Sequence, residues 1–374
     1  MGPGWRVGRL AGIDLAIHPS WLVIAFLLTF SLADAFLPSM IPGWTVGQYW
    51  LLGAATAFLF FASVLAHEFS HALVARRFGL KVAGITLFIF GGATSIESDS
   101  RSPREEALIA LAGPVSSLVI GAALLGIAAL VDSREAGAVL WWLGVINVVL
   151  GVFNLVPGYP MDGGRVLRAI LWRLRGDPNT ATRQAAIVGR VVGYLMVAGG
   201  IYWALRSRDI GSGLWLALVG WFLATAAEAT MQQAGVERSL SGVRVRDAMD
   251  DAPPAVSPNE SVADLVSERM LRGDDRSFMV RHDDGGLAGM VTLGDVKRLP
   301  RDAWADARVT DIMTRFGDLA TIGPDEPLAD ALRLLQEREV GQLPVMGAED
   351  RSPLGIVTRR GILRLIEARM KLGV

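Results

Sequence analysis

Long apolar stretches dominate the first two thirds of the chain. About 20 apolar residues in a helix are needed to span the hydrocarbon core of a bilayer. The sequence offers such stretches at about 19 to 38, 48 to 75, 105 to 131, 136 to 156, 187 to 206 and 212 to 233. The pattern therefore predicts a polytopic α-helical membrane domain with six transmembrane helices, over residues 1–235.

A different apolar pattern separates the second and third of these stretches. Residues 80–97 are rich in β-branched side chains and contain Gly91 and Gly92, which suits short strands or a re-entrant hairpin better than a full helix. Non-helical backbone at membrane depth has to be shielded by protein. We therefore expect a small membrane-associated β-sheet here.

From about residue 243 the chain becomes polar and repeats itself. VRDAMD at 245 recurs as VTDIMT at 309, and GMVTLGDV at 289 recurs as GIVTRRGI at 355. Self-similarity of this kind indicates two copies of one supersecondary unit. Each copy is expected to contain a short strand, a helix, a strand pair and a closing helix. The sequence thus predicts a soluble α/β pair, with copies at 243–303 and 307–372.

Composition and charge narrow the possible functions. The chain of 374 residues is 52% hydrophobic with a net charge of −1, which excludes a disordered polymer and a strong nucleic-acid binder. It has no cysteine, so any metal must be held by histidines and carboxylates. Arg and Lys gather at the helix ends that share a side with both termini. We expect a multi-pass protein of the cell membrane, with both termini and the repeated domain in the cytoplasm.

The motif HEFSH lies near the end of the second apolar stretch. It places His67 and His71 one helical turn apart on one face, with Glu68 beside the first. Two imidazoles at this spacing can share a zinc ion, while the glutamate accepts a proton from water that the metal has made acidic. Only four histidines occur in the chain. The alternative is a solvated helix end just beyond the membrane.

Two histidines do not complete a catalytic zinc site, and Asp162 is the best candidate for a third ligand. It lies in NLVPGYPMDGGR, where Pro157 and Pro160 end the fourth helix and allow the chain to bend a carboxylate back toward the metal. The alternative is a cytosolic turn followed by an amphipathic surface helix. Arg165 is expected to be a cation that snorkels to the cytosolic surface rather than a partner of Asp162.

These motifs together resemble the site-2 protease family of intramembrane zinc metalloproteases. The resemblance covers about residues 5 to 233 and rests on HEFSH, on FGG at 90–92 and on the pattern Asn154, Pro157, Pro160, Asp162, Gly163. It implies a zinc metalloendopeptidase with one Zn²⁺ per chain. By this likeness the zinc ligands are His67, His71 and Asp162, Glu68 is the general base, and Asn154 positions the substrate carbonyl or stabilises the oxyanion.

The same resemblance implies the kind of substrate. Residues 80–97 are similar to the family's membrane-embedded sheet, where an unwound substrate could pair edge to edge. The expected partners are the lipid bilayer and a transmembrane protein substrate, for example a membrane-tethered transcription regulator. A helical substrate would have to be unwound locally before its peptide bonds reach the metal.

The repeated half resembles the cystathionine-β-synthase (CBS) domain pair. That family contacts ribose and phosphate through a Gly, x, x, Thr, x, x, Asp pattern, which Gly289, Thr292 and Asp295 match. In the second copy Gly361 replaces the Asp. The resemblance implies one adenine nucleotide (ATP, ADP or AMP) per chain as a regulator, and a homodimer through the CBS domains. The alternative is that nucleotide binding is completely lost and that Thr292 and Asp295 only cap a helix.

Two other functional classes remain open at this level. A transporter or channel gated by a CBS pair could use intramembrane His, Glu and Asp as ion ligands, but it does not need a glutamate between two histidines at zinc spacing. A nonproteolytic scaffold that senses nucleotide would tolerate loss of Glu68.

Overall fold

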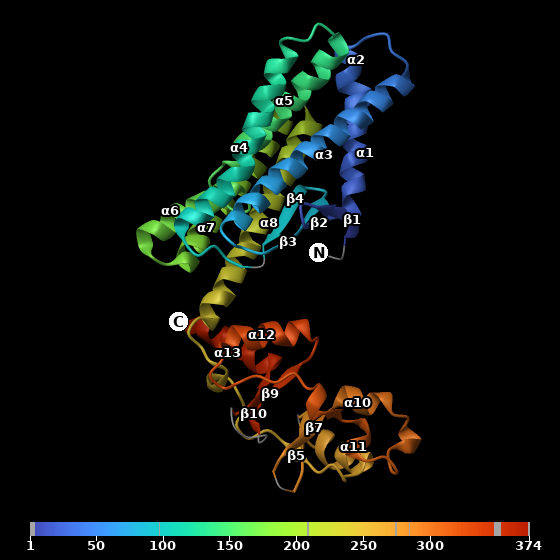
Figure 1. Ribbon diagram of the computed structural model, residues 1–374, viewed down its shortest axis with the longest axis vertical. Coiled ribbons are helices and arrows are strands. Elements are labelled where there is room, and N and C mark those ends of the chain that lie inside the picture. The colour runs from blue at the N-terminus through green and yellow to red at the C-terminus, as the bar shows by residue number, and fades with distance from the viewer. Residues whose placement is uncertain are drawn as a thin grey trace. The chain divides into compact units, whose positions relative to one another are not determined.

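The computed structural model describes residues 4–96, 98–207, 209–273, 275–283, 285–347 and 353–372 (Figure 1). The chain forms two compact units, residues 1–234 and 235–374. Among the described residues, six helices are long and apolar enough to cross a membrane, which confirms that prediction. They are α1 (Ser20–Ser31) continued through residues 32–36 into α2 (Leu37–Met40), α3 (Val46–Arg77), α4 (Pro103–Ala128), α5 (Arg134–Asn154), α7 (Pro178–Ser207) and α8 (Ile210–Leu240).

The fifth of these helices begins nearer the N-terminus than its apolar run indicates. Pro178 is its first residue, where the missing N–H costs nothing. The Asp177 carboxylate accepts hydrogen bonds from the amides of Asn179 and Thr180, at 3.1 and 3.0 Å. This N-terminal cap allows the polar segment before the apolar run to join α7.

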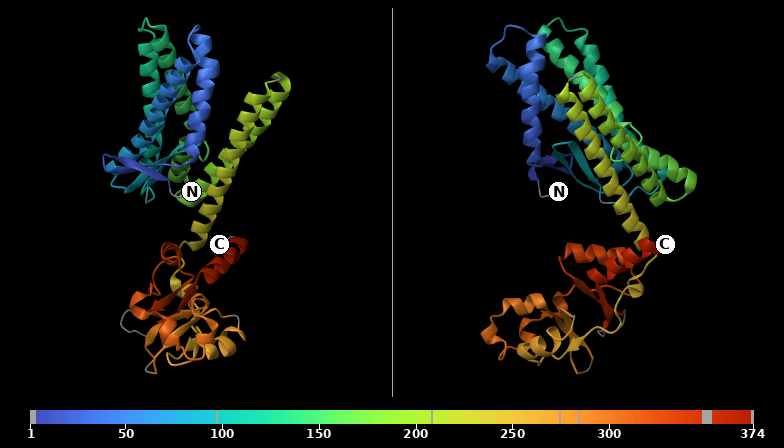
Figure 2. Two further views of the ribbon diagram at one scale, coloured as in Figure 1. Left: turned by 90° about the vertical axis from the view of Figure 1, so that its right-hand side faces the viewer. Right: turned by 180° about the vertical axis from the view of Figure 1, so that it is seen from behind.

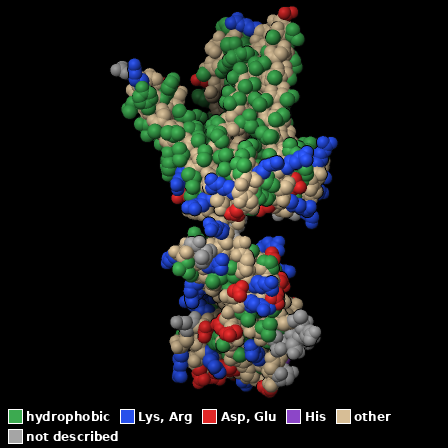
Figure 3. All heavy atoms as spheres, turned by 90° about the vertical axis from the view of Figure 1, so that its left-hand side faces the viewer, with side chains coloured by type: hydrophobic (Ala, Val, Ile, Leu, Met, Phe, Trp, Pro, Cys, Tyr) green, Lys and Arg blue, Asp and Glu red, His purple; other side chains and the backbone are tan. Residues whose placement is uncertain are grey.

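Small residues bring α7 and α8 close together. The two helices run side by side (Figure 2). A Cβ at Gly193 of α7 would lie only 2.7 Å from the backbone oxygen of Gly220 and the backbone nitrogen of Ala224 in α8. Such close approach of two backbones is a common source of helix association in lipid. Figure 3 shows hydrophobic side chains along the helices of this unit, with Lys and Arg gathered in a band below them.

A four-stranded sheet completes the first unit. Its order is β1 (Trp5–Leu10), β2 (Ile13–Ile17), β3 (Val82–Phe88) and β4 (Gly91–Ile96), with only the β2–β3 pair parallel. The strands expected within 80–97 are confirmed, whereas β1 and β2 were not predicted. Their pairing with β3 is between segments far apart in the sequence, so no local signal announces it. Buried contacts among Ile13, Ala72 and Ile85 pack the sheet against α3.

The second unit confirms the soluble α/β pair. In the first copy a short strand, a helix, an antiparallel strand pair and a closing helix follow one another, and the second copy repeats this order with its first strand reduced to a parallel bridge between Ile322 and Val345. The elements are β5 (Ala255–Val256), α9 (Val262–Asp264), β6 (Ser277–Arg281), β7 (Leu287–Thr292), α10 (Leu293–Arg298), α11 (Val309–Ile312), β8 (Thr314–Arg315), α12 (Leu328–Glu337), β9 (Gln342–Met346), β10 (Pro353–Thr358) and α13 (Arg359–Leu372).

Candidate metal centre

Helix α3 places both histidines of HEFSH in the interior of the first unit. His67 and His71 are each only 4% exposed, and they lie one turn apart within the last three turns of the helix. Their Nε2 atoms are 3.2 Å apart. Two imidazoles that face each other in a buried space cannot be explained as a solvated helix end.

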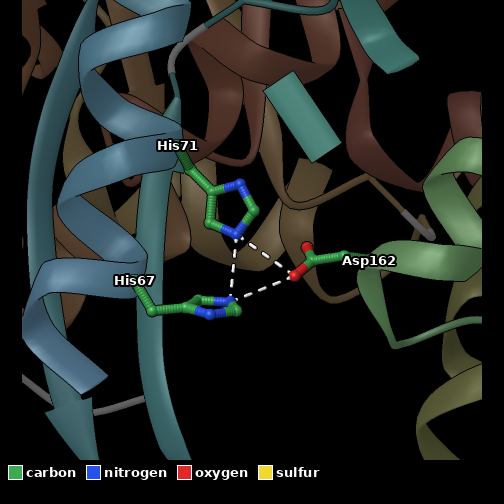
Figure 4. A group of neighbouring side chains, drawn as sticks. All are labelled: His67, His71 and Asp162. Atoms are coloured by element: carbon green, nitrogen blue, oxygen red, sulfur yellow. Dashed lines mark hydrogen bonds and ion pairs between the residues drawn. The ribbon is translucent and has the colours of Figure 1, made fainter. Parts of the chain in front are cut away.

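Helix α6 (Asp162–Arg175) brings the third polar side chain to the same point. The Oδ2 atom of Asp162 lies 3.2 Å from Nε2 of His67 and 3.1 Å from Nε2 of His71 (Figure 4). The two alternatives for this segment were a carboxylate bent back toward the metal and a turn followed by an amphipathic helix, and each is correct in part. The chain does leave α5 through an irregular, proline-containing segment and enter an amphipathic helix, but the first residue of that helix directs its carboxylate to the histidines.

The three side chains fit a tetrahedral zinc ion. Zinc bonds to nitrogen and oxygen of about 2.0–2.2 Å in a tetrahedron would separate ligand atoms by about 3.3 Å. The observed distances of 3.1 to 3.2 Å among the three ligand atoms agree with this value. The Nδ1 atom of His71 donates to the backbone oxygen of Ile109 at 2.7 Å, so a neutral His71 presents a lone pair at Nε2. Lone pairs that converge with a carboxylate suit a cation.

Helix α4 supports this site from a second side, a role that was not predicted from the sequence. The Oγ atom of Ser117 lies 2.9 Å from Nδ1 of His67, and the backbone oxygen of Ile109 accepts from Nδ1 of His71, so α4 contacts the same ring atom of both histidines. A Cβ at Gly113 would lie 2.5 Å from Nε2 of His67 and closer still to Nε2 of His71. The spacing of residues 109, 113 and 117 on one helical face is the only signal in the sequence that could have suggested this.

Glu68 is held beside the histidines by the sheet. Thr94 of β4 donates a hydrogen bond from Oγ1 to Oε2 of Glu68 at 2.7 Å and lies 3.1 Å from the Glu68 backbone oxygen. A Cβ at Gly92 would clash with Cγ of Glu68, so a glycine at this position lets the sheet approach. The carboxylate is half-buried and accepts a hydrogen bond from Thr94. This role of Thr94 was not predicted from the sequence.

Asp162 carries a negative charge in this site. Burial alone would raise the pKa of Asp162, but hydrogen bonds and charge from the two histidines lower that pKa to about 2, so the carboxylate is ionised.

The prediction that Arg165 snorkels to the cytosolic surface is wrong. Its Nε donates to Oε1 of Glu106 at 2.9 Å, and only 27% of its side chain is exposed. A buried carboxylate on α4 offers this cation a better partner than water does.

Asn154 lies at the last turn of α5, eight positions before Asp162. Its Nδ2 donates to the backbone oxygen of Leu150 at 3.0 Å, within its own helix. The side chain is half-buried. To contact a substrate, the amide would have to exchange this local hydrogen bond.

The predicted nucleotide residues lie in the second unit. Thr292 and Asp295 line a cleft of about 460 Å³. They also cap α10: Thr292 Oγ1 donates to Asp295 Oδ2 at 2.7 Å, and Oδ2 accepts from the Thr292 amide at 2.9 Å. Gly289 does not line this cleft; a Cβ there would clash with the backbone oxygen of Thr314 on β8. A second cleft of about 950 Å³ contains Gly361.

Comparisons with known proteins agree with the metalloprotease and CBS resemblances of the two halves of the chain. A model of peptidase family M50 matches residues 55–134 and 128–198, and a model of the CBS domain matches 245–302 and 309–368. A protein of Mycobacterium tuberculosis named as a zinc metalloprotease, Rip3, is 36% identical over 365 residues, which cover 96% of this chain and 92% of that protein. A protein of Synechocystis, also named as a zinc metalloprotease, is 32% identical over 364 residues, with coverage of 97% and 95%.

A solved structure is also similar to part of the chain. The site-2 protease from Methanocaldococcus jannaschii aligns with a TM-score of 0.44 and 29% sequence identity, covering 61% of this chain and 95% of that protein.

Proposed function

The chain belongs to peptidase family M50, the site-2 protease type of zinc metalloprotease, and carries a CBS domain pair; on that premise we propose that it cleaves other membrane proteins within or beside their transmembrane segments. The observation that carries the proposal is the convergence of two histidines from α3 and one aspartate from α6 on a single buried point. The transporter alternative has no need for this arrangement.

We assign the binding of one Zn²⁺ per chain to His67, His71 and Asp162. When bound, zinc supplies Lewis acidity, which makes water acidic near neutral pH and polarises a peptide carbonyl. Glu68 accepts the proton of the attacking water and then delivers it to the leaving nitrogen. The hydrogen bond from Thr94 fixes the rotamer of Glu68 for this transfer.

Asn154 is assigned the role of contacting the substrate near the reacting carbonyl. Its side-chain amide can donate to an oxyanion, because its present acceptor is only a backbone oxygen of its own helix. It also stands at the point where α5 ends and the segment leading to Asp162 begins.

The free edge of β4 is a suitable place for the substrate backbone. Among the described strands, β4 pairs with β3 on one side and with no strand on the other. The same strand carries Thr94, which contacts Glu68, so a strand added to this edge would lie close to the general base. A substrate helix must therefore be unwound first. Membrane-tethered transcription regulators are the substrates that we propose.

The CBS pair, assigned to 243–303 and 307–372, is proposed to regulate the protease by binding an adenine nucleotide beside Thr292 and Asp295. Binding can regulate only if the nucleotide has different affinities for two conformations. We place both termini and this pair in the cytoplasm and propose that the pair forms a homodimer.

Purified full-length protein tests the activity directly. Reconstituted with a tagged single-span substrate, the wild type should release two fragments, and Glu68→Gln should lower the cleavage rate by about 10²- to 10⁴-fold while zinc content stays the same. Glu135 is a partly exposed glutamate in the first turn of α5, and Glu135→Gln is the matched control, which should cleave normally. Cleavage by Glu68→Gln at the wild-type rate would refute the role of Glu68 as general base.

A further inference from the structure

Within the first unit, Glu106 is a fully buried carboxylate that the proposed reaction does not use. It is 1% exposed and lies in the first turn of α4. Its Oε1 accepts from Nε of Arg165 at 2.9 Å and lies 3.3 Å from Nη1 of Arg168, both on α6. We propose that the Glu106–Arg165 ion pair is a positioning device that holds α6 so that Asp162 completes the zinc site. This inference rests on the zinc-binding role proposed for Asp162.

One face of α4 carries the groups that orient both histidines. Glu106, Ile109, Gly113 and Ser117 follow at spacings of three, four and four residues, so they share one face of the helix. The backbone oxygen at 109 and the hydroxyl at 117 orient the two histidines, and the absent Cβ at 113 leaves the space between them. One stripe of α4 therefore sets the position of both histidine ligands.

Helix α6 links Asp162 to that face of α4 through Arg165. Asp162 and Arg165 are three residues apart and so project from the same side of this helix. Arg165 is tied to Glu106 at the end of the same α4 stripe, and Arg168 adds a hydrogen bond from Nε to Thr182 of α7 at 2.8 Å. In the described residues, α6 has no side-chain hydrogen bond that caps its N-terminus. The ion pair is thus the polar contact nearest to Asp162 that ties α6 to the stripe of α4 that orients the histidines.

Glu106 is buried too deeply to remain charged without a partner. A carboxylate buried to this degree needs a paired cation, because the charge would otherwise be desolvated without compensation. The side chains of Arg165 and Arg168 are 27% and 12% exposed. A pocket of about 230 Å³ borders the cluster. Loss of either partner would leave the other charge able to turn toward this pocket, and α6 would lose its fixed distance from α4.

Zinc affinity of the full-length protein, measured by competition with a chelator, tests the proposal without any use of activity. Glu106→Gln and Arg165→Gln should each weaken zinc binding by about 10- to 100-fold, the range found for residues that orient metal ligands. The double variant should bind zinc no more weakly than the weaker-binding single variant, because all three variants lose the same Glu106–Arg165 ion pair. Glu105→Gln and Arg173→Gln, the same changes at neighbouring positions, should bind zinc as the wild type does.

A pure charge effect on the metal gives a different result. Removing the positive charge of Arg165 would then strengthen zinc binding, whereas removing the negative charge of Glu106 would weaken it. Tighter or unchanged binding by Arg165→Gln, or additive losses in the double variant, would overturn the positioning role. If Glu106→Gln fails to fold, as judged by thermal unfolding of the zinc-free protein, Arg165→Gln alone decides. Absence of zinc from the wild type would instead refute the proposed function itself.

Discussion

Short motifs predicted both the metal centre of the first unit and the Thr292–Asp295 cleft of the second. The side chains at these two places are arranged differently. At the metal centre, side chains from α3 and α6 meet in a buried space and face one another. In the CBS unit, Thr292 and Asp295 satisfy each other by capping the helix on which they lie. The first arrangement fits a cation shared by side chains from distant elements, whereas the second is explained by local helix capping.

This comparison shows which kinds of motif carry functional information. Buried polar atoms normally find hydrogen-bond partners. Where distant elements direct two imidazole nitrogens and a carboxylate at one buried point, a shared cation is the simplest partner for all three. Where a Thr and an Asp three residues apart form a capping box, local structure explains both residues, and nucleotide binding needs a separate test.

Removal of the third ligand should give the largest effect. Asp162→Asn should weaken zinc binding by more than about 100-fold, beyond the loss typical of residues that only orient ligands, because one of three ligands becomes a neutral amide. Zinc content after dialysis against a chelator measures this. Asp132→Asn, an exposed position between α4 and α5, is the control. Equal zinc content in the two variants would remove Asp162 from the ligand set.

A methyl group placed in the metal space should have a smaller but still large effect. Gly113→Ala keeps all three ligands, but its Cβ would overlap the Nε2 atoms of both histidines, and zinc affinity should fall by about 10- to 100-fold. Gly126→Ala lies on the same helix with no neighbour within 4 Å and should bind zinc normally. Both changes favour the helix locally by about 1 kcal/mol, so low helix stability cannot explain a loss. Unchanged affinity in Gly113→Ala would show that the ligands meet elsewhere.

A substitution in the CBS cleft should have the smallest effect. It distinguishes helix capping by Thr292 from nucleotide binding by Thr292. Thr292→Ala should cost about 1 kcal/mol of stability through the lost cap, and it should also weaken ATP or AMP binding if the cleft is a nucleotide site. Ser261→Ala removes a similar cap, on α9, away from the cleft.

Nucleotide-dependent shifts in Tm distinguish the two roles. With nucleotide present, wild type and Ser261→Ala should gain the same stabilisation, and Thr292→Ala should gain less. Equal gains in all three would restrict Thr292 to capping.

Features that depend on neighbouring residues were predictable from sequence. The helix lengths follow from runs of apolar residues, and the internal repeat follows from self-similarity. His67 and His71 share a face because four residues make about one helical turn. Even so, the start of α7 was misplaced, because a cap made by Asp177 and Pro178 extended the helix beyond its apolar run.

Features that depend on contacts between distant segments were decided by the tertiary structure. The sequence alone determined that two histidines and a glutamate stand on one helix, and that Asp162 follows a break in another. Only packing brought Asp162 to the histidines, placed Ser117 and the Ile109 carbonyl behind them, paired Arg165 with Glu106 and joined β2 to β3. The physical reason is that helix periodicity is local, whereas a buried polar group takes whichever partner the whole fold brings within hydrogen-bond distance.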